Sequence, residues 1–375
     1  MNERERFLTT MNHQRPDRIP TIIDTRLGVQ ETLKNYYRVS SFQEVLDIMG
    51  AVETFRFPND GWIKLNFPGY DEKAELMEGA WKDYDRGGVL KYIKIDEKIF
   101  KDSWGAFWRI SDDEEFVGWL SGPLVNAKDP DEIDEIFIPG INDIVDDPNL
   151  PKNVQELKEK GIFVRGTITQ VYKQAWMLRG MQNVLMDFLI NKPFIEKLYD
   201  KIYRLDGEIL RRMTKSGMDM VGFDGDIAMQ HSLMMGENIW RAFDKPRLAE
   251  VVALCKKTNP DVHIYMHSDG DISKVIPDLI EIGFDVIDPI QPESMDPIKQ
   301  KKLFGDKITL HGCGSLQKTL PFGTPEDCRK EAIYYIEQCG QNGGLVLGAS
   351  NTINYDVPVQ NIVAWYEAVR DYIFK

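Results

Sequence analysis

The chain has 375 residues, of which 42% are hydrophobic, and it carries a formal net charge of −14. This length and apolar content allow a full core in one or two domains and exclude wholesale disorder. The acidic balance, without a basic stripe, argues against nucleic acid as a partner. We expect a cytoplasmic protein, because no apolar run reaches membrane length, no signal peptide opens the chain and its four cysteines show no paired spacing.

The first 57 residues predict short helices and strands. Apolar spacing indicates helices at 2–13, 29–37 and 41–49, and strands at 19–23 and 51–57. Ser40 or Ser41 is the expected N-cap of the third helix.

Residues 58–150 differ from the preceding segment in their composition and in the spacing of their apolar residues. Tryptophans at 62, 81, 104, 108 and 119 alternate with glycines and acids, and runs near residues 92 and 107 alternate with period two. Such alternation predicts antiparallel strands in a region inserted in, or capping, a larger fold. These aromatic side chains either form an apolar cover over a substrate or fill an ordinary core.

After residue 150 strands and helices alternate regularly. The expected strands are 162–168, 220–226, 263–267, 284–290, 307–311 and 344–347. The expected helices are 171–189, 193–216, 237–257, 272–283, 297–304, 325–339 and 359–373. Thr324 and Pro325 begin the helix at 325–339, and Gly340 ends it.

Eight strand candidates separated by helices predict a parallel sheet. An open doubly wound sheet is the structural competitor, but no glycine-rich phosphate fingerprint follows the first strand. We therefore predict a closed (β/α)₈ TIM-like barrel with an inserted, partly antiparallel cap, in one domain over residues 1–375.

Polar residues recur where the predicted strands end, which is where barrel enzymes hold their active sites. A single strand-end histidine is as readily a hydrogen-bonded structural residue as a functional one, but the recurrence favours an active site. The ring comprises Asp24, Arg26, Asp224, Asp226, His267, Asp269, Asp288, Glu293, His311, Cys313, Ser350 and Asn351.

The chain contains the phrases Arg4-Glu-Arg-Phe, Arg15-Pro-Asp-Arg-Ile-Pro, Pro289-Ile-Gln-Pro-Glu-Ser-Met-Asp, Leu310-His-Gly and Leu320-Pro-Phe-Gly-Thr-Pro-Glu. Together these phrases resemble the uroporphyrinogen decarboxylase superfamily. The resemblance covers most of the chain, is weakest at 58–150, and implies a distorted (β/α)₈ barrel. That superfamily holds both the haem-pathway decarboxylase and cobalamin-dependent methyltransferases.

Departures from the superfamily pattern favour the methyltransferase branch. The decarboxylases use an Arg-Gln-Ala-Gly-Arg run after the first strand to hold substrate carboxylates, whereas Arg26 is the sole arginine of the equivalent stretch 23–28. A substrate with eight carboxylates needs several cationic partners. Decarboxylase activity is therefore the second hypothesis.

The methyltransferase branch shows a His-x-Cys and a later Cys that hold zinc. This chain keeps His267 but has Asp269 in place of the thiol, and no Cys lies near Ser350. Cys313 lies two residues after His311, at the end of the strand before the one that leads to Ser350. We therefore predict a zinc site formed by Asp269 (or, in its place, His267), Glu293 and Cys313, with one position open.

The resemblance implies an O-demethylase component that moves a methyl group from a small methoxy compound, such as an aromatic ether, or from a methylamine, to a cobalamin protein. A metal would polarise the ether oxygen, or an acid would protonate it. The expected catalytic residues are Asp24, Arg26, Asp224, Asp226, His267 and Asp288. We expect His311, Ser350 and Asn351 to bind the cofactor.

The expected partners are a corrinoid protein and a small methyl donor, without nucleic acid or membrane, and a homodimer is an open alternative. A third hypothesis, from another functional class, is a non-catalytic barrel that binds a tetrapyrrole or a corrinoid.

Overall fold

The computed structural model describes the chain except for residues 54–62, 67–91, 112–116 and 375. Its α-helices are α1 Glu3–Met11, α2 Leu27–Tyr37, α3 Phe42–Met49, α4 Leu150–Glu159, α5 Val171–Arg179, α6 Met181–Ile190, α7 Lys192–Lys215, α8 Glu237–Thr258, α9 Ile276–Glu281, α10 Pro297–Phe304, α11 Thr319–Phe322, α12 Pro325–Cys339 and α13 Val359–Asp371. Two 3₁₀ turns, η3 Pro130–Asp134 and η4 Ile141–Asp143, lead out of the cap region.

The strands fall into parallel and antiparallel groups. The parallel ones are β1 Ile22–Ile23, β2 Val52–Glu53, β9 Arg165–Thr169, β10 Met220–Asp224, β13 His263–His267, β14 Val286–Ile290, β15 Thr309–Gly314 and β16 Leu345–Ala349. The antiparallel ones are β3 Ile63–Leu65, β4 Tyr92–Lys94, β5 Ile99–Asp102, β6 Phe107–Ile110, β7 Val117–Ser121, β8 Ile144–Asp146, β11 Ala228–Met229 and β12 Ser232–Leu233.

The core of the fold is a parallel sheet in the order β9-β10-β13-β14-β15-β16. A parallel bridge between Thr21 and Leu347 places β1 beside β16, and β1 pairs in parallel with β2. The protein is therefore an α/β protein, and its described residues form eight parallel strands near their expected positions. Part of the expected strand 51–57 lies outside the described residues. No pairing between β2 and β9 is recorded among the described residues.

The two ends of this row of strands share one interior. Val52 of β2 and Phe163, just before β9, belong to the same apolar cluster as Phe7 and Met11 of α1. The row must therefore curl around that interior, with α1 against the amino ends of the strands.

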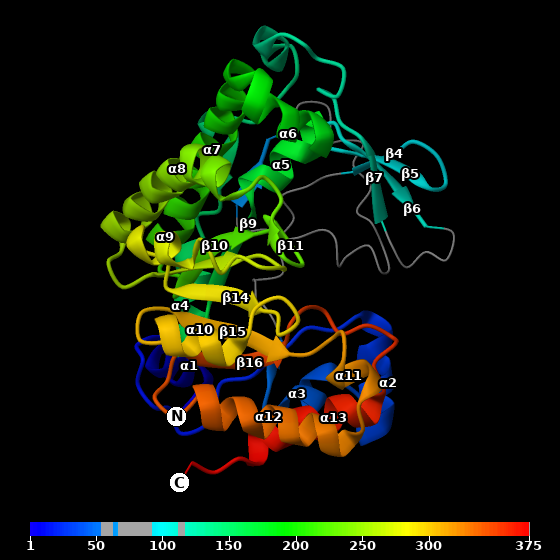
Figure 1. Ribbon diagram of the computed structural model, residues 1–375, viewed down its shortest axis with the longest axis vertical. Coiled ribbons are helices and arrows are strands. Elements are labelled where there is room, and N and C mark those ends of the chain that lie inside the picture. Colours follow the sequence, from blue (N-terminus) through cyan, green and yellow to red (C-terminus); the bar gives the residue numbers. More distant parts are fainter. Residues whose placement is uncertain (54–62, 67–91, 112–116, 375) are drawn as a thin grey trace.

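The helices α7, α8, α10, α12 and α13 lie around the outside of the parallel strands (Figure 1). Every residue of β10, β14 and β15 is buried, as expected for a parallel sheet covered by helices. The helix ends follow the local sequence: Thr324 and Asp327 form a capping box at α12, and Ser41 caps α3 as expected.

One expected helix, at 171–189, is two. α5 ends and α6 begins at Gly180, which has φ +84 and breaks the helical path. Glycine adopts this conformation without the clash that a Cβ atom would cause, so the apolar periodicity continues while the helix axis does not.

The cap region contains the expected antiparallel strands. β4 to β7 form a four-stranded sheet that projects to the side of the parallel strands, and β3 pairs with β8 (Figure 1). Trp119 of β7 anchors this sheet, because its indole N–H donates to the Met177 carbonyl at 2.8 Å and its ring packs edge-on against Trp176. Trp108 donates to Asp102.

The tryptophans that the structure describes in this region pack within the cap or against α5, which favours the core-filling alternative for them. Trp62 and Trp81 lie outside the described residues.

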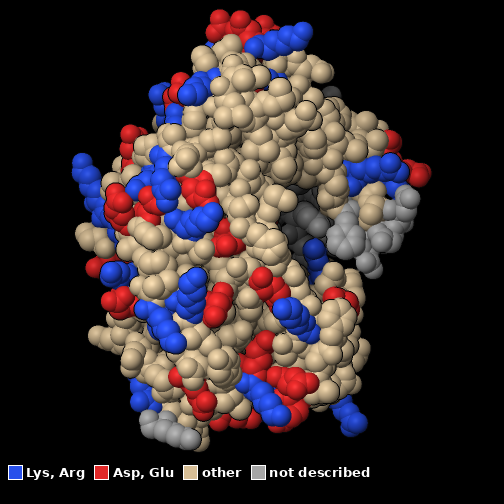
Figure 2. Space-filling view, viewed as in Figure 1, with Lys and Arg blue, Asp and Glu red and all other residues tan. Residues whose placement is uncertain are grey.

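Within the described parts of the chain, no helix is both long enough and apolar enough to cross a membrane. On the face drawn in Figure 2, Lys and Arg are interspersed with Asp and Glu over the helices around the sheet.

A buried carboxyl group joins α7 and α8. Asp244 is 0% exposed and accepts a hydrogen bond from the Tyr203 hydroxyl at 2.8 Å. Burial raises the pKa of Asp244 to about 7, although Tyr203 offsets part of the shift. Because the unfolded carboxyl titrates near pH 4, the folded protein holds this proton from about pH 4 to pH 7 while the unfolded chain loses it.

We therefore expect Asp244 to make the protein less stable as pH rises through this window. Asp244→Asn should remove this contribution to the pH dependence of the free energy of unfolding. The stability of the variant relative to the parent should therefore rise by about 3 kcal/mol between pH 5 and pH 8. Urea unfolding at both pH values measures the change. Asp261→Asn, at an exposed turn, is the control. Parallel behaviour of the parent and Asp244→Asn would contradict the expectation.

Candidate active site at the carboxyl ends of the strands

A cavity of about 110 Å³ opens at the carboxyl ends of the parallel strands. Its wall combines the ends of β1, β10, β13, β14, β15 and β16 with one side chain of α5. Eight of the expected site residues line it: Asp24, Asp224, Asp226, His267, Asp288, His311, Ser350 and Asn351. Since parallel strands end at one edge, groups far apart in the chain meet here.

Asp288 is the buried centre of this cavity and is 5% exposed. One of its oxygens lies 2.6 Å from His311 Nδ1, and the other lies 3.4 Å from both His267 Nδ1 and an Arg165 nitrogen. Burial acts to raise the pKa of Asp288, but His311 and His267 outweigh it and hold the pKa well below its usual range. Asp288 is thus a permanent anion that orients two imidazoles.

His267 ends β13 next to several carboxylates. Burial acts to lower its pKa, but Asp224 and Asp288 raise the pKa to about 9. The imidazole therefore carries a proton at neutral pH unless a cation replaces that proton.

Asp226, His267 and Asp269 form a cluster with metal-ligand spacing. One donor atom from each lies within 4.8 Å of the other two. Burial, followed by the neighbouring Asp226, raises the pKa of Asp269 to about 6, against the opposing effect of His267. Two carboxylates this close repel each other unless a cation or a proton lies between them.

The hydrogen bonding of the two Asp269 oxygens indicates whether this cluster fits a metal ion. Oδ2 accepts a hydrogen bond from Asn351, whereas Oδ1 is buried without a hydrogen-bond partner among the described residues. Buried acceptors are normally paired, so an unpaired buried oxygen on a residue of this cluster fits a cation ligand. One imidazole and two carboxylates suit a zinc ion or a similar divalent ion with an open position.

Sequence comparison shows to which family this chain belongs. The model of the family described as "Uroporphyrinogen decarboxylase (URO-D)" matches residues 154–372. The chain belongs to the URO-D family.

Curated relatives of this URO-D family member are distant. Uroporphyrinogen decarboxylases of Chlorobium phaeovibrioides and Chlorobium luteolum are each 24% identical over 262 residues, covering 67% of this chain and 71% of theirs. A solved methyltransferase from Methanosarcina mazei is 16% identical, with a TM-score of 0.61 over 99% of both chains. That likeness shows a shared fold.

In this URO-D family member the expected ligand set Asp269, Glu293 and Cys313 is not assembled, and that expectation was wrong. Cys313 is 0% exposed in the main apolar core and does not line the cavity. Gly312 and Cys313 have φ of +97 and +76, which breaks the alternation of β15. His311 therefore faces the cavity, while the thiol has Cys339 and Glu331 of α12 among its electrostatic neighbours.

Three further expected residues, Asp269, Glu293 and Arg26, also lie outside the cavity lining, although Asp269 is close to Asp226 and His267, which line it. Glu293 accepts a hydrogen bond from the Ser315 hydroxyl in the loop beyond β15. Arg26 is the N-cap residue of α2, and its backbone N–H donates to the Ile353 carbonyl. Arg26 follows a strand of only two residues, so the chain has already turned into α2 when it reaches this position.

The position of Cys313 gives a testable outcome. Cys313→Ser should leave metal content and activity unchanged, because the thiol lies in the core away from the cavity. It should cost about 1–3 kcal/mol of stability, since a hydroxyl is buried in apolar surroundings. Metal analysis and urea unfolding of the variant measure the two effects. A loss of metal without a loss of stability would restore the thiol as a ligand.

Two cationic residues of the site have no counterpart among the expected ones. Arg165 opens β9, and its guanidinium lies 3.9 Å from the ring centre of Tyr265 and contacts Asp288. Lys173 of α5 lines the cavity, and its stem lies over Gly225, where a Cβ would come within 2.9 Å of it. Arg165 begins its strand and Lys173 lies inside the helix that follows β9, so a search of the loop residues at strand ends could not find them.

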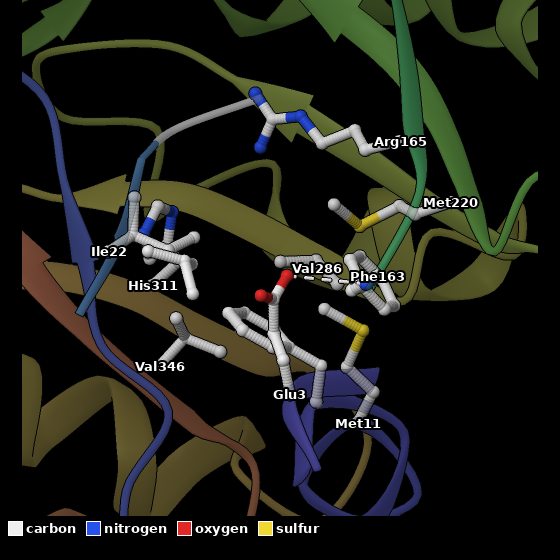
Figure 3. A pocket seen from close by; sticks show the side chains of 11 residues that line it. Glu3, Met11, Ile22, Phe163, Arg165, Met220, Val286, His311 and Val346 are labelled. Carbon is white, nitrogen blue, oxygen red and sulfur yellow. Dashed lines mark hydrogen bonds between the residues drawn. The ribbon is translucent and has the colours of Figure 1, made fainter. Parts of the chain in front are cut away.

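A second, smaller cavity of about 30 Å³ lies inside the sheet towards α1. Its wall is largely apolar, but Glu3 of α1 extends its carboxylate into it, and Arg165 and His311 also line it (Figure 3). The Glu3 carboxylate accepts the Phe163 N–H at 3.2 Å. His311 and Ile22 line both cavities, so they separate the apolar interior from the polar site above.

Proposed function

We propose that this protein is a corrinoid-dependent methyltransferase that takes a methyl group from a small methoxy compound, or from a methylamine, and passes it to the cobalamin of a partner protein. Under this proposal the eight parallel strands close into a (β/α)₈ barrel, and residues 1–375 form one domain with the cap as an insertion. A divalent metal such as zinc would bind at Asp226, His267 and Asp269.

The Asp226–His267–Asp269 cluster is the main observation that supports this proposal. It occupies the strand end where the zinc-binding His-x-Cys of the methyltransferase branch is expected, and it replaces the thiol with oxygen donors. The fold shared with the Methanosarcina mazei methyltransferase over its whole length supports the same branch.

The charge of the cavity favours a neutral donor over uroporphyrinogen. The described lining contains four carboxylates, Asp24, Asp224, Asp226 and Asp288, and one lysine, Lys173. A substrate with eight carboxylates would need an excess of cations that this wall does not provide. A divalent metal would instead neutralise the excess negative charge and leave a site suited to an uncharged ether.

Different residues of the site would have different roles in the reaction. Asp226, His267 and Asp269 would hold the metal, which when bound would polarise the donor oxygen and make the alcohol a better leaving group. Asp288 orients His267 from behind, as carboxylates do for metal-binding histidines. Thr352 donates to Asp24 at 2.8 Å and fixes that carboxylate at the rim, within reach of a donor. The buried His311–Asp288 pair keeps the floor of the site closed.

The test combines metal analysis with a transfer assay. Purified protein should contain or bind one divalent metal per chain, and it should methylate cob(I)alamin from at least one member of a panel of methoxybenzenes, methanol and methylamines. Removal of the metal with a chelator should abolish transfer, and zinc should restore it. Transfer at an undiminished rate without metal would replace this mechanism with acid catalysis by the carboxylates.

The second candidate is uroporphyrinogen decarboxylase, which the matched curated relatives favour. Release of carbon dioxide from uroporphyrinogen without any methyl transfer would establish it. Neither activity, with tight binding of a corrinoid, would indicate a non-catalytic corrinoid-binding barrel.

A further inference from the structure

Asn351, in the loop after β16, contacts the candidate metal cluster from a different part of the chain. Its Nδ2 donates to Asp269 Oδ2, and its Oδ1 accepts the Thr352 backbone N–H at 2.6 Å. Both partners require this orientation of the amide, because a carboxylate only accepts and a backbone N–H only donates. The side chain is therefore fixed at both ends.

Because of this contact, the two oxygens of Asp269 differ in their hydrogen bonding. Oδ2 is occupied by Asn351, while Oδ1 is buried and has no hydrogen-bond partner among the described residues. The Asp269 backbone N–H donates to Asp226 Oδ1 at 2.9 Å, which holds the Asp226 carboxylate beside Asp269. Rotation of the Asp269 carboxylate would break the hydrogen bond from Asn351, so Asn351 holds the carboxylate in the orientation that leaves Oδ1 without a hydrogen bond and able to act as a ligand atom.

We propose that Asn351 is a positioning residue that sets the metal affinity of the Asp226–His267–Asp269 cluster. This inference rests on the proposed function, and it assigns Asn351 to the metal cluster in place of the cofactor-binding role expected from the sequence. Hydrogen-bonding partners of metal ligands change metal affinity about 10–100-fold when they are removed. Asn351 is exposed, so its loss should leave the fold intact.

The next residue provides a matched control. Thr352 lies in the same loop, is also part of the cavity wall, and donates from Oγ1 to Asp24, which is outside the metal cluster. Removing its hydroxyl disturbs the loop and one site carboxylate, but none of the three proposed ligands.

The experiment measures zinc affinity by competition with a chelator, without any methyl donor. Asn351→Ala should weaken zinc binding about 10–100-fold, and Thr352→Val should leave it within about twofold. Asn351→Ser, which keeps a shorter donor, should lose less affinity than Asn351→Ala. Thermal unfolding without metal should be nearly the same for all variants, which separates positioning from a general effect on the fold.

The outcomes distinguish this inference from the proposed function. Equal zinc affinity of the parent protein and Asn351→Ala would overturn the role of Asn351 and leave the methyltransferase proposal standing. Equal losses in Asn351→Ala and Thr352→Val would overturn it too, because the loop as a whole would then be responsible. Failure of the parent protein to bind any zinc would overturn both the metal cluster and the role of Asn351.

Discussion

Replacing His267 by alanine should abolish metal binding and lower methyl transfer at least about 100-fold. The imidazole is the sole nitrogen donor of the cluster with Asp226 and Asp269. Without it the two carboxylates remain close together, and they hold a divalent ion such as zinc far less tightly. Metal content after gel filtration and the rate of cob(I)alamin methylation measure the two losses.

A second histidine provides the control for this substitution. His231 lies on the short hairpin beyond β10, is exposed, and is absent from the cavity lining. His231→Ala should retain metal and activity within about twofold, as surface substitutions usually do. Full metal content in His267→Ala would show that the metal, if bound, is held elsewhere.

Replacing Asp288 by asparagine should have the largest effect on stability among the site residues. Its carboxylate contacts His311, His267 and Arg165, and Arg165 is 5% exposed. Removing one partner of a buried ionic network leaves the remaining charges uncompensated, which costs about 3–5 kcal/mol. The asparagine still offers one carbonyl, so we expect a loss of about 3 kcal/mol in urea unfolding.

Asp288→Asn should also weaken metal binding, because His267 would lose the carboxylate that orients its ring. Asp200→Asn is the control, since Asp200 forms an ion pair with Arg247 at the surface with 61% of its side chain exposed. That change should cost less than about 1 kcal/mol and leave metal binding intact. Similar stability losses in the two variants would contradict a central role for Asp288.

The local patterns of the sequence were sufficient to predict most of the elements. His263–His267 is a strand at its expected bounds, because its apolar alternation and the following Ser-Asp-Gly turn both act over a few residues. The helix Pro325–Cys339 also has its expected bounds, because Thr324, Pro325 and Asp327 satisfy its free amino end locally. Where a strand ends was therefore readable, and with it the edge at which polar side chains gather.

Local sequence patterns gave wrong predictions where the backbone conformation, or contacts between residues far apart in the chain, determine where a side chain lies. The direction of the Cys313 side chain depends on two successive positive φ angles, which a strand pattern does not reveal. Glu293 was expected beside the metal because of its sequence position, but its carboxylate instead accepts a hydrogen bond from Ser315, which follows β15.

The sequence by itself determined the succession of strands along the chain, the approximate positions of their ends, and most of the polar residues near those ends. Only the tertiary structure decided that Asp226 joins His267 and Asp269, that Asn351 holds Asp269, and that Arg165 reaches Asp288. Secondary structure depends on neighbours within a few residues, whereas Asp226 and His267 are 41 positions apart in the chain and Arg165 and Asp288 are 123 apart. Such contacts form only when the parallel strands pack side by side.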